Sequence, residues 1–194
     1  MSKIEKKSPT ELELHPLIAN RWSPRIFDPS AKMDEHDLAA ILEAARMAPS
    51  AFNEQPWRYL IGRRDDSIFT SILNGLSEFN QAWARNSSAL ILVCAKTRRA
   101  NGDPIKTYKY DLGLSVSQAG FEAHHRGFFA HHMAGFDPKF MVDTFQLEDL
   151  EPVVVVALGR LGDVERHSEQ EIERERTIST RRPLSEIVLK GLDA

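Results

Sequence analysis

The chain has 194 residues, of which 42% are hydrophobic and 27% are charged, and its formal net charge is −3. This length favours one domain with its own core, and the weakly acidic balance argues against a nucleic-acid-binding protein. No apolar run reaches the roughly 20 residues of a membrane helix, and the N-terminus lacks the apolar stretch of a secretory signal. We therefore expect a single domain over residues 1–194, cytoplasmic and without a membrane partner, with residues 1–10 flexible.

The first predicted elements are helices. The stretch HPLIANRWS reads as a short helix with Pro16 in its first turn, ended by the Ser23-Pro24 step. In MDEHDLAAILEAARMAPS, Asp34 can cap a helix whose apolar residues recur at i, i+3, i+4 and i+7 from Leu38. This second helix should end at Pro49. A strand at WRYLIG and an aspartate-capped helix at DDSIFTSILNGL follow.

Two continuous apolar runs, ALILVCA and PVVVVALG, are typical of central strands covered on both faces. The segment between them, KTYKYDLGLSVSQAGFEAHHRG, is long enough for a central helix, and its small residues would allow close packing, including against a copy of itself. Gly127 should end this helix and leave FFAHHMAGFD as a loop or a short strand. DPKFMVDTF has an Asp cap and a first-turn Pro, so it predicts another helix. The fold class is α+β, with a small central mixed sheet surrounded by helices.

The end of the chain is strongly charged. DVERHSEQEIERERTISTRR interleaves acids and bases, which is typical of a solvated helix or arm. The EIVL that follows could be an added strand or part of an arm that reaches a partner. We expect residues 164–194 to form a C-terminal arm that contacts the partner subunit.

Cysteine and histidine usage argues against a metal centre. The only cysteine, Cys94, excludes a disulfide framework and is expected to be a buried thiol. Four of the seven histidines fall in AHHRGFFAHHMAGFDP. On one helix His124 and His131 would lie about 10 Å apart, too far to share one ion. No HExxH spacing is present either, so we predict no metal site.

Three stretches could bind a ligand, although each alone could be ordinary surface or turn structure. RWSPR presents two guanidiniums and a hydroxyl on a bend that cannot be helical, which suits a phosphate monoester. APSAFNEQPWRY brings Ser50, Asn53 and Gln55 into one loop, and their side chains supply the donors and acceptors that the edge of a heterocycle needs. TRRPLSEIV adds two adjacent arginines. The dinucleotide motif GxGxxG, the P-loop and GxSxG are all absent from the sequence.

The order and intervals of RWSPRIFDP, APSAFNEQPWRY, HHMAGFDP, VVVVALGRLGD and RRPLSEIV resemble the nitroreductase family of flavoproteins over about residues 15 to 190. The resemblance implies an intertwined homodimer with FMN at its interface. It also implies ping-pong hydride transfer from NADH or NADPH through FMN to nitroaromatic, quinone or similar electron-poor acceptors. No catalytic side chain is implied, because the cofactor carries the hydride.

The resemblance also implies roles for residues. Arg21 and Ser23 would hold the FMN phosphate and ribityl chain, and Arg25 the pyrimidine edge of the flavin. One of two terminal arginines would reach the phosphate, and a backbone N–H of Ala134 or Gly135 would face N5. Pro49, Ser50, Ala51 and Asn53, with Gln55 as a further member, would come from the other subunit. The implied cofactor-binding residues are Arg21, Trp22, Ser23, Arg25, Pro49, Ser50, Ala51, Asn53, Gln55, His132, Met133, Ala134, Gly135, Arg181 and Arg182.

Some residues depart from the family pattern and leave alternatives open. Trp22 and Pro24 stand where many relatives have a basic or small residue, and Trp22 could either pack in the core or touch the cofactor. Ala134 stands where larger members carry an acid. His131 and His132 could line the substrate face or pack in the FMN pocket. A specialised flavoenzyme of the same fold, such as a reductive dehalogenase or a flavin-consuming enzyme, and a non-catalytic flavin-binding protein remain alternative functions.

Overall fold

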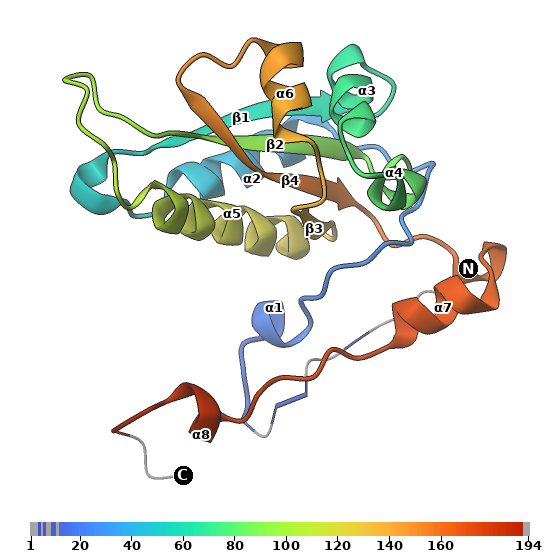
Figure 1. The fold of residues 1–194 in the computed structure, drawn as a ribbon. Coiled ribbons are helices and arrows are strands. Elements are labelled where there is room, and N and C mark those ends of the chain that lie inside the picture. Colours follow the sequence, from blue (N-terminus) through green and yellow to red (C-terminus); the bar gives the residue numbers. More distant parts are fainter. Residues whose placement is uncertain (1–3, 5, 7–8, 11, 192–194) are drawn as a thin grey trace.

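The structure, a computed structural model, describes residues 4, 6, 9–10 and 12–191. Most of the segment 1–10, which we expect to be flexible, therefore lies outside the described residues. Helices pack on both faces of a central sheet, and a terminal arm extends away from this layered body (Figure 1). Among the described residues, no helix is both long enough and apolar enough to cross a membrane.

The sheet has four strands in the order β1-β2-β4-β3. They are β1 (Trp57–Arg63), β2 (Ala89–Lys96), β3 (Phe129–Met133) and β4 (Leu150–Gly159). The two apolar runs are the central strands β2 and β4, as predicted. Every pair is antiparallel, so the mixed sheet that we expected is wrong for the described part of the chain. The first antiparallel pair arises because the connection after β1 returns to the same end of the sheet. The start of β2 therefore lies opposite the end of β1.

The apolar runs feed two cores because their side chains alternate between the faces of the sheet. On one face, Leu92 and Cys94 pack with α3 (Ser67–Asn74), α4 (Glu78–Ala84) and α6 (Pro138–Phe145). On the other face, Ile91 and Val93 pack with α2 (Glu35–Arg46) and α5 (Tyr108–His125). The thiol of Cys94 is buried, as predicted, and burial raises its pKa to about 12.

The predicted helix caps are confirmed. Asp34 accepts a hydrogen bond from the backbone N–H of Asp37 at the start of α2, and Asp66 and Asp137 cap α3 and α6 in the same way. Gly127 follows the end of α5 with a φ of 77°, a conformation that glycine adopts without strain. The chain can therefore turn at once into β3, which decides between the two predicted states of this segment in favour of a short strand.

Helices α1 (Pro16–Ala19), α7 (Glu169–Arg176) and α8 (Leu184–Ile187) lie outside the layers (Figure 1). The charged run forms α7, a helix that begins with a capping box at Ser168, so the predicted solvated helix is confirmed. The EIVL segment contributes to α8, and the alternative of an added strand is wrong for this chain. The arm ends with large apolar side chains in solvent, and Leu189 is 90% exposed.

Candidate functional site

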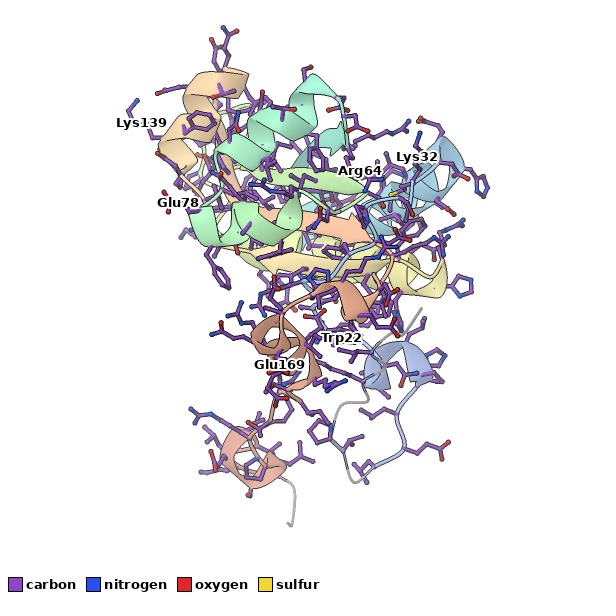
Figure 2. All side chains as sticks on the ribbon, turned by 90° about the vertical axis from the view of Figure 1, so that its right-hand side faces the viewer. Trp22, Lys32, Arg64, Glu78, Lys139 and Glu169 are labelled. Atoms are coloured by element: carbon purple, nitrogen blue, oxygen red, sulfur yellow. The ribbon has the colours of Figure 1, made fainter. Side chains whose placement is uncertain are left out.

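The bend at residues 21–25 and the arm that follows α7 enclose a pocket of about 470 Å³. Trp22 lies where the layered body meets α1 and α7, which marks the place of this pocket in Figure 2. We call it the cationic pocket. Its lining residues are Lys6, Arg21, Trp22, Ser23, Arg25, His131, Arg174, Glu175, Thr177, Ile178, Ser179 and Arg181.

The bend is held open by two buried polar groups. The carboxylate of Glu175 accepts hydrogen bonds from the backbone N–H groups of Arg25 (3.0 Å) and Ile26 (3.1 Å), and its side chain is only 3% exposed. His131 donates from Nδ1 to the carbonyl oxygen of Pro24 at 2.8 Å. Burial lowers the pKa of His131 to about 4, and nearby Arg25 adds to this effect, so the ring is neutral at pH 7. Together these contacts keep the RWSPR backbone irregular.

The pocket carries more positive than negative charge. Burial lowers the pKa of the Arg21 guanidinium, and the neighbouring Arg181 lowers it further. Burial and Arg174 likewise lower the pKa of Arg25, against the opposing effect of Glu175. Cations that repel one another in a partly buried site are stabilised by an anion between them. Arg21 also donates to the hydroxyl of Ser23 at 3.5 Å, so a hydroxyl group lies beside this charge.

Arg25 has an unused donor. Its Nε is buried and, within the described chain, has no hydrogen-bond partner. Its guanidinium lies 5.6 Å from the ring centroid of Phe79, and Arg174 lies 5.5 Å from the same ring. A buried donor without a partner costs free energy, and a ligand acceptor in the pocket would remove that cost.

The two terminal arginines have different surroundings. Arg181 lines the cationic pocket, where its Nη1 donates to the carbonyl oxygens of Ser179 (3.3 Å) and Thr180 (2.9 Å). Arg182 is not among the lining residues and forms an exposed ion pair with Glu186 at 3.5 Å. Of this pair, the structure brings Arg181 together with Arg21.

The loop that the sequence singled out at residues 49–55 lies apart from the cationic pocket of its own chain. It contains a short 3₁₀ helix (η1, Ala51–Asn53), and Phe52, Asn53 and Gln55 all have positive φ angles. Such angles cost non-glycine residues of the order of 1 kcal/mol or more, so they need support. Ser50 Oγ accepts a hydrogen bond from the Gln55 N–H at 3.0 Å, and a carboxylate of α5 supports the Ala51 end of the loop.

That carboxylate belongs to Asp111, a buried residue of α5. It accepts a hydrogen bond from the Ala51 N–H at 3.3 Å and from the Thr107 hydroxyl at 2.9 Å. Pro49, Ser50, Ala51, Asn53 and Gln55 thus form one ordered loop, but none of them lines the cationic pocket. Phe52 in the middle of this loop is 91% exposed.

The segment after β3 is fastened to α4. The carbonyl oxygen of Gly135 accepts hydrogen bonds from the backbone N–H of Ser77 (2.9 Å) and from Asn80 Nδ2 (3.0 Å). A Cβ at Gly135 would lie 2.8 Å from that Asn80 nitrogen, so a larger residue at this position would displace the Asn80 side chain. Met133 is buried in the core, whereas Ala134 and Gly135 are exposed.

A second hollow, of about 440 Å³, follows α5 and the edge of the sheet. We call it the α5 groove. Gly113 and Gly120 form part of its floor, and His132 lines it. Arg21 and Trp22 line both hollows, so the cationic pocket and the α5 groove adjoin. His131 and His132 therefore have different surroundings. His131 is buried against the bend, whereas His132 faces the α5 groove.

Trp22 packs edge-on against Phe129 with ring centroids 5.9 Å apart, while also lining both hollows. Trp22 therefore packs against β3 at the edge of the sheet and also forms part of the wall of both hollows.

Sequence reasoning missed several residues of these sites, among them Asn80, Arg174, Glu175 and Lys6. Asn80 gave no signal in SEFNQAW, and Glu175 and Arg174 were hidden in a charge pattern that indicates a solvated helix. Lys6 lies in an N-terminal segment that carries no motif. The sequence pattern does not indicate Glu175, because it is the one buried residue of α7 and most of its neighbours in that helix are charged.

Comparisons with known proteins found a matching family model and several similar proteins. The model of the nitroreductase family matches residues 18–74, which include the bend and the 49–55 loop. A solved structure described as an oxidoreductase containing FMN is 33% identical, covers 96% of each chain and has a TM-score of 0.88. An uncharacterized 15.4 kDa protein of Mycolicibacterium smegmatis is 35% identical over 69% of this chain and 95% of its own length.

A further relative is the major NAD(P)H-flavin oxidoreductase of Aliivibrio fischeri, 33% identical over 54% of this chain and 48% of its own length. The chain thus spans about half of that relative and nearly all of the two others. The chain belongs to the nitroreductase family.

Proposed function

We propose that this protein is a single-domain, FMN-dependent oxidoreductase that uses NADH or NADPH to reduce nitroaromatic, quinone or similar electron-poor acceptors. The observation that carries the proposal is the cationic pocket, in which Arg21, Ser23 and Arg25 meet Arg181 from the other end of the chain. Membership in a family with a flavin oxidoreductase and an FMN-containing oxidoreductase supports the choice of cofactor.

The residues present fit a phosphate monoester at one end of the pocket. Arg21 and Arg181 supply guanidiniums, which bind phosphate through paired N–H donors, and Ser23 supplies a hydroxyl. We propose that these three side chains hold the FMN phosphate. Arg182 is then a surface residue, since its side chain is directed to Glu186.

The fit extends to the ring end. The unpartnered Nε of Arg25 requires an acceptor, and the pyrimidine edge of a flavin offers carbonyl and ring-nitrogen acceptors. Bound FMN would supply the redox chemistry, which is the transfer of a hydride from NAD(P)H to the acceptor in a ping-pong sequence. Arg25 would stabilise the negative charge that develops at this edge on reduction, because its cation is already fixed in place. Glu175 and His131 hold the backbone on either side of it.

The exposed segment at Ala134 and Gly135 is assigned to the flavin ring, along which its backbone would lie with His132 and Met133. Its hydrogen bonds to Ser77 and Asn80 fix the segment before any ligand binds, so little freedom is lost on binding. An alanine at position 134 leaves this side of the ring open to an acceptor.

We further propose that the functional unit is a homodimer. The 49–55 loop is ordered but distant from its own chain's cationic pocket, and a second copy would bring Pro49, Ser50, Ala51, Asn53 and Gln55 to that site. The α5 groove, floored by small residues, would receive the second copy's helix. The apolar side chains on the arm over residues 164–194, such as Leu189, would then be covered as well.

The test is spectroscopic. The purified protein should be yellow, release FMN on denaturation, and oxidise NADH or NADPH when an electron-poor acceptor is added. A colourless protein that cannot be reconstituted with FMN would sink the proposal. A yellow protein whose colour neither nucleotide bleaches would instead be a flavin carrier. A panel of nitroaromatic, quinone, halogenated and enone acceptors would then separate a general reductase from a specialised enzyme.

A further inference from the structure

Lys6 is a member of the cationic pocket that no sequence motif indicates. It lies far from the bend in sequence and further still from the arm, yet it contacts both. Its ammonium donates to the carbonyl oxygen of Thr177 at 2.9 Å and lies 4.2 Å from the ring centroid of Trp22. The side chain thus spans the opening between the bend and the arm.

We propose that Lys6 is a further phosphate-binding residue, which adds a fourth donor group to Arg21, Ser23 and Arg181 at the phosphate end of the pocket. The inference rests on the proposed function, since the phosphate monoester in question is that of FMN. It assigns a binding role to a residue outside the range 18–74 matched by the family model.

The hydrogen bond to Thr177 links Lys6 to the segment that leads to the phosphate end of the pocket. Thr177, to which Lys6 is bonded, begins the segment that carries Ser179 and Arg181 into the pocket. An ammonium has three N–H donors, and Thr177 uses one of them, which leaves two for phosphate oxygens. A compact ammonium binds a phosphate as a point charge and needs no fixed orientation, in contrast to a guanidinium.

The charges around Lys6 leave it in a pocket with a net positive charge. Glu175 is the one carboxylate among the lining residues, and its oxygens already accept the N–H groups of Arg25 and Ile26. Burial lowers the pKa of Lys6 and Arg25 lowers it further, although Glu175 opposes both effects. An added dianion would compensate this cation directly, whereas an empty pocket leaves it among other cations.

The experiment compares two ligands that differ only in the phosphate. Apo-protein is titrated with FMN and with riboflavin, and flavin fluorescence gives each dissociation constant. We expect Lys6→Ala to weaken FMN binding about tenfold, as for one partly exposed charged hydrogen bond, and to leave riboflavin binding within about twofold. Lys6→Arg keeps the charge and should restore most of the FMN affinity.

Lys32 provides the matched control, because it is an exposed lysine on the layered body away from Trp22 (Figure 2). Lys32→Ala should bind both flavins as the wild type does. Equal weakening of FMN and riboflavin by Lys6→Ala would mean that Lys6 supports the fold and not the phosphate, and unchanged FMN binding would remove it from the site. If wild-type protein binds riboflavin as tightly as FMN, the phosphate assignment of the whole pocket is wrong, and that of Lys6 with it. Failure of the wild type to bind either flavin would refute the proposed function itself.

Discussion

Replacing Glu175 with alanine is expected to lower the free energy of unfolding by about 3 kcal/mol, because two backbone donors lose their acceptor. Ile26 is 4% exposed, so its N–H cannot turn to water, and leaving it unpaired costs about 2 kcal/mol. Arg25 is only half-buried, so water can reach its N–H and the cost there is about 1 kcal/mol. Glu175→Gln keeps an acceptor oxygen but loses the charge, and about half of the effect should remain.

The assay is urea unfolding of the apo-protein at one fixed protein concentration, followed by tryptophan fluorescence. Glu173→Ala is the matched control, because it makes the same change at an exposed position of the same helix, and it should stay within about 0.5 kcal/mol of wild type. If Glu175→Ala is no more destabilising than this control, the carboxylate does not hold the bend and the reasoning is refuted.

Three further outcomes are expected. Arg21→Ala should weaken FMN binding by about tenfold to a hundredfold, since it removes a guanidinium from the phosphate end, whereas Arg182→Ala should not. A dissociation constant of Arg21→Ala for FMN equal to that of the wild type would contradict the assignment. Because the pKa of His131 falls from 6.5 to about 4 on folding, unfolding free energy should rise with pH across that window and be fully gained above it. In urea, His131→Gln should lose up to about 3 kcal/mol of this pH dependence, and an unchanged slope would rule out the buried neutral ring. A Cβ added at Gly113 meets no described atom of its own chain within 4 Å, so the Gly113→Leu subunit should fold, but sedimentation should show monomers if the α5 groove receives a second copy.

Most of the layered body could be predicted from local sequence. Aspartate caps at Asp34, Asp66 and Asp137 and the two apolar runs each report on a few neighbouring residues, and the structure has those elements at those places. Strand direction could not be predicted in this way, because it depends on where a connection returns to the sheet. The expected mixed sheet failed for that reason.

The candidate site shows the same division. The sequence RWSPR predicts a non-helical cluster of cations, and Arg21, Ser23 and Arg25 do line one pocket. The structure was needed to choose between Arg181 and Arg182, because the sequence of an irregular segment does not show which of two adjacent side chains faces a pocket. Lys6 and Glu175 belong to the site because they contact residues that are distant in sequence, and a local sequence pattern cannot predict such contacts.

The central claim concerns hydride transfer through a flavin held in the cationic pocket. Its most direct test is an anaerobic titration of the reconstituted protein with NADH and, separately, NADPH, followed in the visible flavin bands. We predict that at least one nucleotide bleaches the bound FMN with about one equivalent per site, and that a nitroaromatic or quinone acceptor then restores the colour. Bound FMN that neither nucleotide reduces would contradict the central claim.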